Sequence, residues 1–163
     1  MRLGGHVSFA VENVEEFEIL TRLRREFGHV SAERLISGPG LSHVYSILCE
    51  MSGQSPVKLS AAEIVERTQN GTDLVAKKTT ELFAEWLGRF AGDDALMFGA
   101  QGGVYIAGGI PPRILDVLIA GRFRKGFESK GRMTDYVKRI PTFVIVIEDA
   151  GLKGAAAILA ASA

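Results

Sequence analysis

Two apolar runs separated by a helical stretch constrain the fold of this chain most strongly. Residues 104–107 (VYIA) indicate a strand that ends on Gly108 and Gly109, and residues 141–149 (PTFVIVIED) form a β-branched run typical of a strand buried on both faces. The stretch between them opens with two prolines, which suit the first turn of a helix. Strands joined by helical crossovers pair in parallel. The sequence therefore predicts an α/β domain.

The rest of the chain is predicted to be mainly helical. Residues 6–10 (HVSFA) alternate as in a short strand, and Asn13 with Glu16 forms a capping-box pattern that opens a helix. The buried stripe predicted for that helix consists of Val14, Phe17, Leu20, Leu23 and Phe27. Further helices are predicted at 31–36, 41–51, 60–69 and from about 72 to 99. The closing residues, 151–163, predict a small-residue helix packed closely on the sheet.

Composition excludes several classes of protein. The 19 basic and 19 acidic side chains cancel, so nothing indicates a nucleic-acid partner. A single cysteine, Cys49, rules out an intrachain disulfide or a cysteine-based zinc cluster, and its apolar helix predicts a buried thiol. The first ten residues lack the apolar region of a signal peptide, and the most apolar window is too short to span a membrane. We therefore expect a soluble, cytoplasmic protein without a membrane partner.

Several segments resemble, in order, the C-terminal half of bacterial-type glucokinases. They are LGGHVSFA, GHVSAERLISGPGL, ALMFGAQGGVYIAGGIPPRI, FESKGR and GLKGAAAIL. The resemblance implies an ATP-dependent kinase that uses Mg²⁺ to transfer the γ-phosphate to the 6-hydroxyl of glucose. It also implies a two-lobed actin-like, ribonuclease-H-like fold. Residues 1–163 would then form the C-terminal glucokinase-like domain, a truncated mixed sheet with many helices.

The same resemblance implies two pairs of binding residues. His6 matches the histidine of an E-G-G-H motif that contacts sugar hydroxyls, although Leu3 stands where that motif has its glutamate. Glu33 matches the sugar-binding glutamate of S-A-E-R. Gly108 and Gly109 match the glycine pair that contacts adenosine. Substrate-binding residues are thus expected at His6 and Glu33, and nucleotide-binding residues at the two glycines.

Three family elements have no counterpart in the sequence: the phosphate loop, the Asn-Asp pair that carries the catalytic base, and a Gly-Thr-Gly loop. The resemblance therefore places no catalytic residue and no metal ligand in this chain, and the chain alone is expected to be inactive. It also implies pairing into a homo-oligomer. The alternative is a non-catalytic module, derived from a sugar kinase, that self-associates or regulates.

Each implied site residue also has a structural interpretation. Most charged residues are exposed, so Glu33 by itself is typical of a solvated helix carboxylate. His6 is equally consistent with a structural histidine at a strand end, and Gly108 with Gly109 would also permit tight packing of a helix on a strand. Trp86 lies on the apolar stripe of the longest helix and is therefore predicted to belong to the hydrophobic core.

Overall fold

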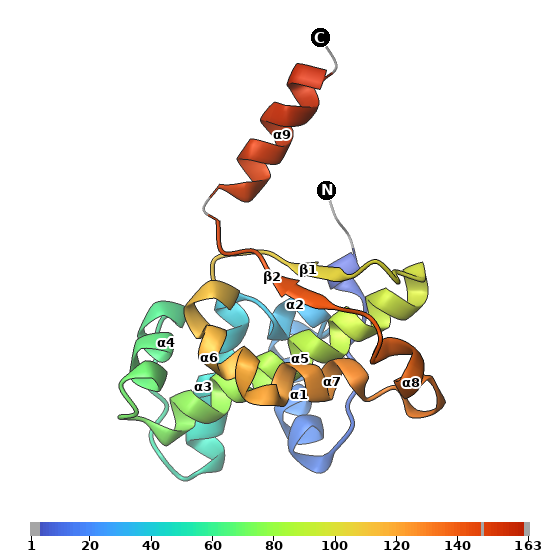
Figure 1. The fold of residues 1–163 in the computed structure, drawn as a ribbon. Coiled ribbons are helices and arrows are strands. Elements are labelled where there is room, and N and C mark those ends of the chain that lie inside the picture. Colours follow the sequence, from blue (N-terminus) through green and yellow to red (C-terminus); the bar gives the residue numbers. More distant parts are fainter. Residues whose placement is uncertain (1–3, 148, 162–163) are drawn as a thin grey trace.

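A helical body carries a two-stranded sheet on one side and a projecting C-terminal helix (Figure 1). The computed structural model describes residues 4–147 and 149–161. The longer helices are α1 (Val14–Phe27), α3 (Gly38–Met51), α4 (Ala61–Gln69), α5 (Leu74–Phe98) and α9 (Ala150–Ala161). The shorter ones are α2 (Ala32–Leu35), α6 (Leu115–Val117), α7 (Phe123–Glu128) and α8 (Thr134–Val137), with 3₁₀ turns at η1 (Gly4–His6), η2 (Pro111–Ile114) and η4 (Gly131–Met133) and a π-helical turn at η3 (Leu118–Arg122).

Strands β1 (Val104–Ile106) and β2 (Thr142–Val144) pair in parallel, which confirms the predicted α/β class. The second strand is shorter than predicted, and it is not buried on both faces. Phe143 is 44% exposed and stacks on Tyr105 of β1, with ring centroids 5.0 Å apart. Helices cover the other face, where Ile106 is buried. One face of this small sheet is thus open to solvent. Strand β2 is therefore covered on one face only, although its β-branched sequence predicted burial on both.

The predicted N-terminal strand at residues 6–10 is wrong. His6 ends the 3₁₀ turn η1, and the only pairing nearby among the described residues is one antiparallel bridge between Ser8 and Ser31. On the side of Val7 the ladder cannot lengthen, because helix α2 begins at Ala32, directly after the bridge. The antiparallel component of the predicted mixed sheet is therefore reduced to this bridge.

Several helix boundaries follow the predicted local chemistry. The side chain of Ser60 accepts a hydrogen bond from the backbone N–H of Glu63, whose carboxylate accepts one from the N–H of Ser60, so α4 opens with a complete capping box. Asp73 caps α5 through the N–H groups of Val75 and Ala76. Helix α3 begins earlier than predicted because Ser37 is its N-cap and Pro39 is accommodated in the first turn.

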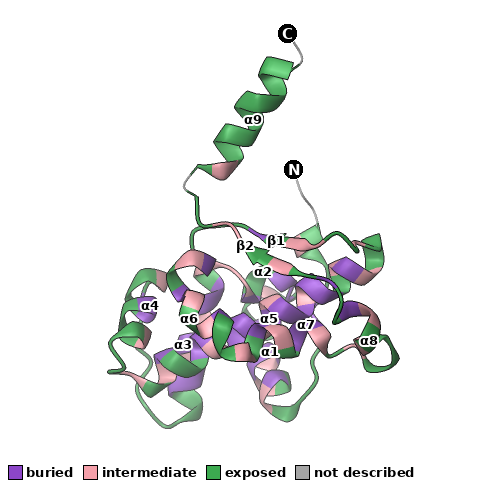
Figure 2. Cartoon of the chain, in the orientation of Figure 1, coloured by how far each residue is buried: buried purple, intermediate pink, exposed green. Residues whose placement is uncertain are grey.

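Helix α5 forms the centre of the core, which is shown in purple in Figure 2. Trp86 is 1% exposed and Cys49 is also buried, as predicted for both. Glycines allow α7 to lie directly on α5: a Cβ on Gly88 would lie 2.0 Å from the carbonyl oxygen of Phe123, and one on Gly126 would lie 2.2 Å from that of Glu85. The contact between these two helices is thus a contact between backbones.

The buried face of α1 differs from the predicted stripe. Asn13 caps the helix as predicted, but Val14 is 84% and Phe17 is 56% exposed. The helix instead buries Glu16, which is 1% exposed and lies beside Ile19. Burial raises the pKa of the Glu16 carboxyl, but hydrogen bonds from Arg89, from the N–H of Glu12 and from Trp86 outweigh it and hold the pKa below its ordinary value. Leu20 and Leu23 of the predicted stripe are buried as predicted, so the stripe is wrong only at its first turn, where Glu16 and its ion pair with α5 lie inside in place of Val14 and Phe17.

Helix α9 does not pack on the sheet, so this prediction is also wrong. Every residue of the helix after Ala150 is exposed, including Leu152, Ile158 and Leu159 (Figure 2). It extends away from the helical body (Figure 1).

Candidate functional site

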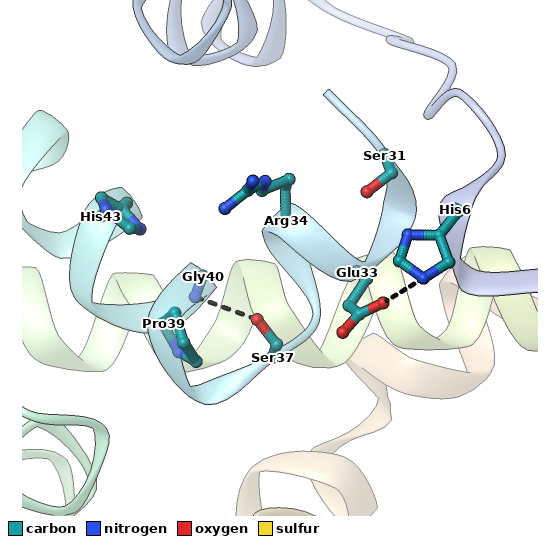
Figure 3. A pocket seen from close by; sticks show the side chains of 8 residues that line it. All are labelled: His6, Ser31, Glu33, Arg34, Ser37, Pro39, Gly40 and His43. Carbon is teal, nitrogen blue, oxygen red and sulfur yellow. Dashed lines mark hydrogen bonds and ion pairs between the residues drawn. The ribbon is translucent and has the colours of Figure 1, made fainter. Parts of the chain in front are cut away.

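A pocket of about 240 Å³ lies where the N-terminal turn meets helices α2 and α3 (Figure 3). Its lining residues are His6, Ser31, Glu33, Arg34, Ser37, Pro39, Gly40 and His43. Both predicted sugar-binding residues therefore line one pocket, although they are far apart in the sequence. The bridge between Ser8 and Ser31 holds their two segments side by side.

His6 and Glu33 face one another directly. His6 Nε2 lies 3.2 Å from Glu33 Oε2, and both side chains are more than half exposed. A carboxylate accepts hydrogen bonds, and an imidazole both donates and accepts them. Paired at one small pocket, these groups place a carboxylate acceptor beside a ring nitrogen that can donate or accept a hydrogen bond.

Backbone contacts hold this pair in place. The N–H of Ala32 donates to the carbonyl of Val7 at 3.0 Å, and the His29 ring lies 3.2 Å from the His6 carbonyl oxygen. On the other side of the pocket, Gly40 donates its N–H to the Ser37 hydroxyl. A Cβ on Gly40 would lie 2.6 Å from the carbonyl oxygen of Leu35, so only glycine allows α3 to approach α2 this closely.

Two cationic or titratable side chains of this pocket were not predicted. The Arg34 guanidinium lies 4.1 Å from the ring centroid of Phe27, and its side chain points away from Glu33 (Figure 3). His43 Nε2 lies 3.8 Å from a carboxylate oxygen of Glu26. Arg34 directly follows Glu33 in the sequence, and His43 lies on the first turns of α3. Their closeness in sequence to the predicted Glu33 is the only feature that could have indicated these two residues.

The predicted glycine pair lies in a different crevice, of about 550 Å³. Gly108 and Gly109 line it together with residues that follow β2, so it lies beyond the carboxyl ends of both parallel strands, where ligands bind in open α/β sheets. Gly108 has φ of +130°, a conformation that other residues rarely adopt. A Cβ on Gly109 would meet nothing within 4 Å. Packing therefore explains neither glycine, and Gly109 borders open space.

The predicted site residues thus line two separate hollows. The His6–Glu33 pair lies at one and the glycine pair at the other. Leu3 lies outside the described residues. Within residues 4–147 and 149–161, no group of three or more His, Cys, Asp or Glu side chains is arranged to hold a metal ion. In the same part of the chain, no helix is long and apolar enough to cross a bilayer.

A family model described as Glucokinase matches residues 3–162. The chain belongs to the glucokinase family. It is 47% identical over 156 residues to the glucokinases of Pectobacterium atrosepticum and Cronobacter sakazakii. These alignments cover 96% of this chain but only 49% of each relative, so the chain spans about half the length of the curated glucokinases it matches.

Solved structures agree with this assignment. A glucokinase from an Antarctic psychrotroph superposes with a TM-score of 0.87 at 39% identity, covering 96% of this chain and 48% of that one. A glucokinase from Balamuthia mandrillaris in complex with glucose superposes with a TM-score of 0.74 at 20% identity, covering 90% and 43%. The second likeness shows a shared fold. A regulatory module is not favoured over a glucokinase fragment, because named glucokinases match nearly the whole chain.

Proposed function

We propose that this chain supplies the C-terminal lobe of an ATP-dependent glucokinase of actin-like architecture. The observation that carries the proposal is the 3.2 Å pair of His6 and Glu33 at one pocket of a chain that belongs to the glucokinase family. The product would be glucose 6-phosphate. Supporting the sugar assignment, the pocket volume of about 240 Å³ lies below the ~300 Å³ from which drug-sized clefts begin. A monosaccharide is a ligand of suitable size.

Each of the four predicted binding residues then has a role. Glu33 would accept hydrogen bonds from sugar hydroxyls, and His6 would donate or accept one beside it. Gly108 and Gly109 would let adenosine approach the backbone beyond the ends of the strands. Phosphoryl transfer depends mainly on such positioning and on stabilising developing charge, with a base that accepts the hydroxyl proton. We assign that base to the other half of the enzyme, so this chain alone should not phosphorylate glucose.

Mg²⁺ would accompany the phosphates of ATP, whose charge it neutralises. The described residues offer no cluster of three metal-ligating side chains, so we assign no step to a metal held by this chain. A second copy of the chain would be the partner in a homo-oligomer. We further propose that the complete enzyme acts in the cytoplasm.

Glu33→Gln should weaken glucose binding in a two-lobed enzyme that contains this chain. The substitution keeps the size of the side chain but replaces a charged acceptor with a neutral one, which costs about 1.5–3 kcal/mol, or roughly 10- to 150-fold in affinity. Isothermal titration calorimetry with glucose measures the loss. Glu66→Gln, at an exposed carboxylate of α4 outside the pocket, is the matched control. Unchanged glucose affinity in a folded Glu33→Gln enzyme would remove glucose from this pocket.

Gly109→Ala should raise the KM for ATP in the same enzyme and leave the KM for glucose and the Tm nearly unchanged. A Cβ at this position meets nothing within 4 Å, so the variant has no packing cost, but the methyl group enters the space proposed for adenosine. Steady-state kinetics and thermal unfolding test the two halves of the expectation. Gly102→Ala, which also projects into open space but outside the crevice, serves as control. A lowered Tm with an unaltered KM for ATP would make Gly109 a structural residue.

A further inference from the structure

The crevice at the glycine pair contains one cation that no other described side chain neutralises. Its charged lining residues are Arg113 and Asp149, and the others are small, apolar or proline. The guanidinium of Arg113 makes no ion pair and no hydrogen bond with another residue within the described part of the chain. A guanidinium that stays unpaired at a ligand-sized crevice is available for an anion.

The backbone of Arg113 is fixed although its side chain is free. Its N–H donates to the carbonyl of Ile110 at 2.9 Å, and its own carbonyl accepts a hydrogen bond from the Gln69 side chain of α4 at 2.8 Å. Pro112, before it, locks one further backbone angle. The arginine therefore projects from a rigid turn, which lowers the entropy lost when its side chain binds a ligand.

Arg113 also borders a second hollow, of about 230 Å³, next to the first. Gly109 is shared by both, and the remaining lining is mostly apolar: Ala61, Ala62, Val65 and Ile110. A flat heterocyclic base suits the apolar hollow, and the charged part of the same ligand would then extend into the crevice. The two hollows share Gly109 and Arg113, so a nucleotide with its base in the apolar hollow would place its ribose near Gly109 and its phosphates in the crevice.

We propose that Arg113 binds a phosphate group of the nucleotide and so distinguishes ADP and ATP from adenosine. The proposal rests on the proposed nucleotide site at Gly108 and Gly109. An arginine presents two parallel N–H groups to phosphate oxygens, whereas the carboxylate of Asp149, which also lines the crevice, repels them. Phosphate binding at this position is therefore attributed to Arg113.

The test compares adenosine with ADP in a two-lobed enzyme that contains this chain. Calorimetry should show that Arg113→Gln weakens ADP binding about tenfold or more and leaves adenosine binding unchanged. Arg113→Lys should recover part of the loss, because it restores the charge without the paired N–H groups. Arg132→Gln removes the same charge from an exposed position outside the crevice and should change neither affinity. Equal thermal unfolding of all variants shows that each is folded.

Two failures can be told apart. If Arg113→Gln weakens adenosine and ADP equally, or weakens neither, the role of Arg113 is overturned even where Gly109→Ala still impairs nucleotide binding. If Gly109→Ala also leaves the binding of both ligands unchanged, the nucleotide does not bind at the glycine pair. The assignment of that crevice in the proposed function is then wrong. A loss confined to ADP in Arg113→Gln supports the inference.

Discussion

Arg89→Met should lower the free energy of unfolding of this chain by about 3–5 kcal/mol, the cost of leaving a buried carboxylate without its partner. The two terminal nitrogens of Arg89 hydrogen-bond the Glu16 carboxylate at 2.8 and 2.9 Å. The arginine is 3% and the glutamate 1% exposed. Arg89 also donates to the carbonyl of Ala10 at 3.3 Å, so it ties the segment after His6 to α5. Urea unfolding followed by circular dichroism and by the fluorescence of Trp86 measures the loss.

The controls separate a buried ion pair from a surface one. The pair of Arg122 with Glu85 is partly exposed, with the arginine side chain at 43%, so Arg122→Met should cost at most about 1 kcal/mol. Replacing both Glu16 and Arg89 with apolar residues should recover part of the loss, since no charge is then left buried. Recovery should be incomplete, because Trp86 donates to Glu16 at 3.1 Å and would lose its acceptor. A loss below about 1 kcal/mol for Arg89→Met would contradict the expectation.

Gly88→Ala should destabilise the chain by about 2 kcal/mol or more, although alanine normally favours a helix interior over glycine by about 1 kcal/mol. The new Cβ would lie 2.0 Å from the carbonyl oxygen of Phe123 and 2.9 Å from its carbonyl carbon. These are backbone atoms, so the clash can be relieved only by moving α7 away from α5. That movement would open the core around Phe127, which is fully buried. Thermal and urea unfolding test the sign and the size.

Gly154→Ala on α9 is the matched control. It makes the same substitution inside a helix, but its Cβ would meet nothing within 4 Å, so only the gain in helix propensity remains. We expect no loss of stability there. If Gly88→Ala were as stable as the unchanged chain, the close packing of α5 on α7 would not constrain the fold.

Little of the candidate site follows from the chemistry of its residues alone. His6, Glu33 and the glycine pair were selected by resemblance to a family, since a lone glutamate or histidine has no distinctive local pattern. The structure places His6 beside Glu33 and leaves open space at Gly109, and both facts favour their assigned roles, which stay predictions. Arg113 was not predicted, because an arginine after two prolines resembles any exposed cation until the crevice beside it is known.

The sequence by itself determined the features that depend on neighbouring residues. The caps at Asn13, Ser60 and Asp73, the long helix α5 and the parallel pairing of β1 with β2 all follow from local hydrogen bonding, helical periodicity and the handedness of crossovers. Such interactions act over a few residues, or over one supersecondary unit, and so appear as patterns in the chain.

Only the tertiary structure decided which faces are buried. It shows Glu16 inside and Phe17 outside, one open face on the sheet, and a helix α9 that projects from the body with its residues after Ala150 exposed. An amphipathic pattern states which side chains favour burial, but burial also requires a partner of the right shape and charge at that place. Arg89, far along the chain on α5, provided that partner for Glu16. Among the described residues, Phe143 stacks only on the exposed Tyr105, and it stays 44% exposed, as Leu152 stays 72% exposed.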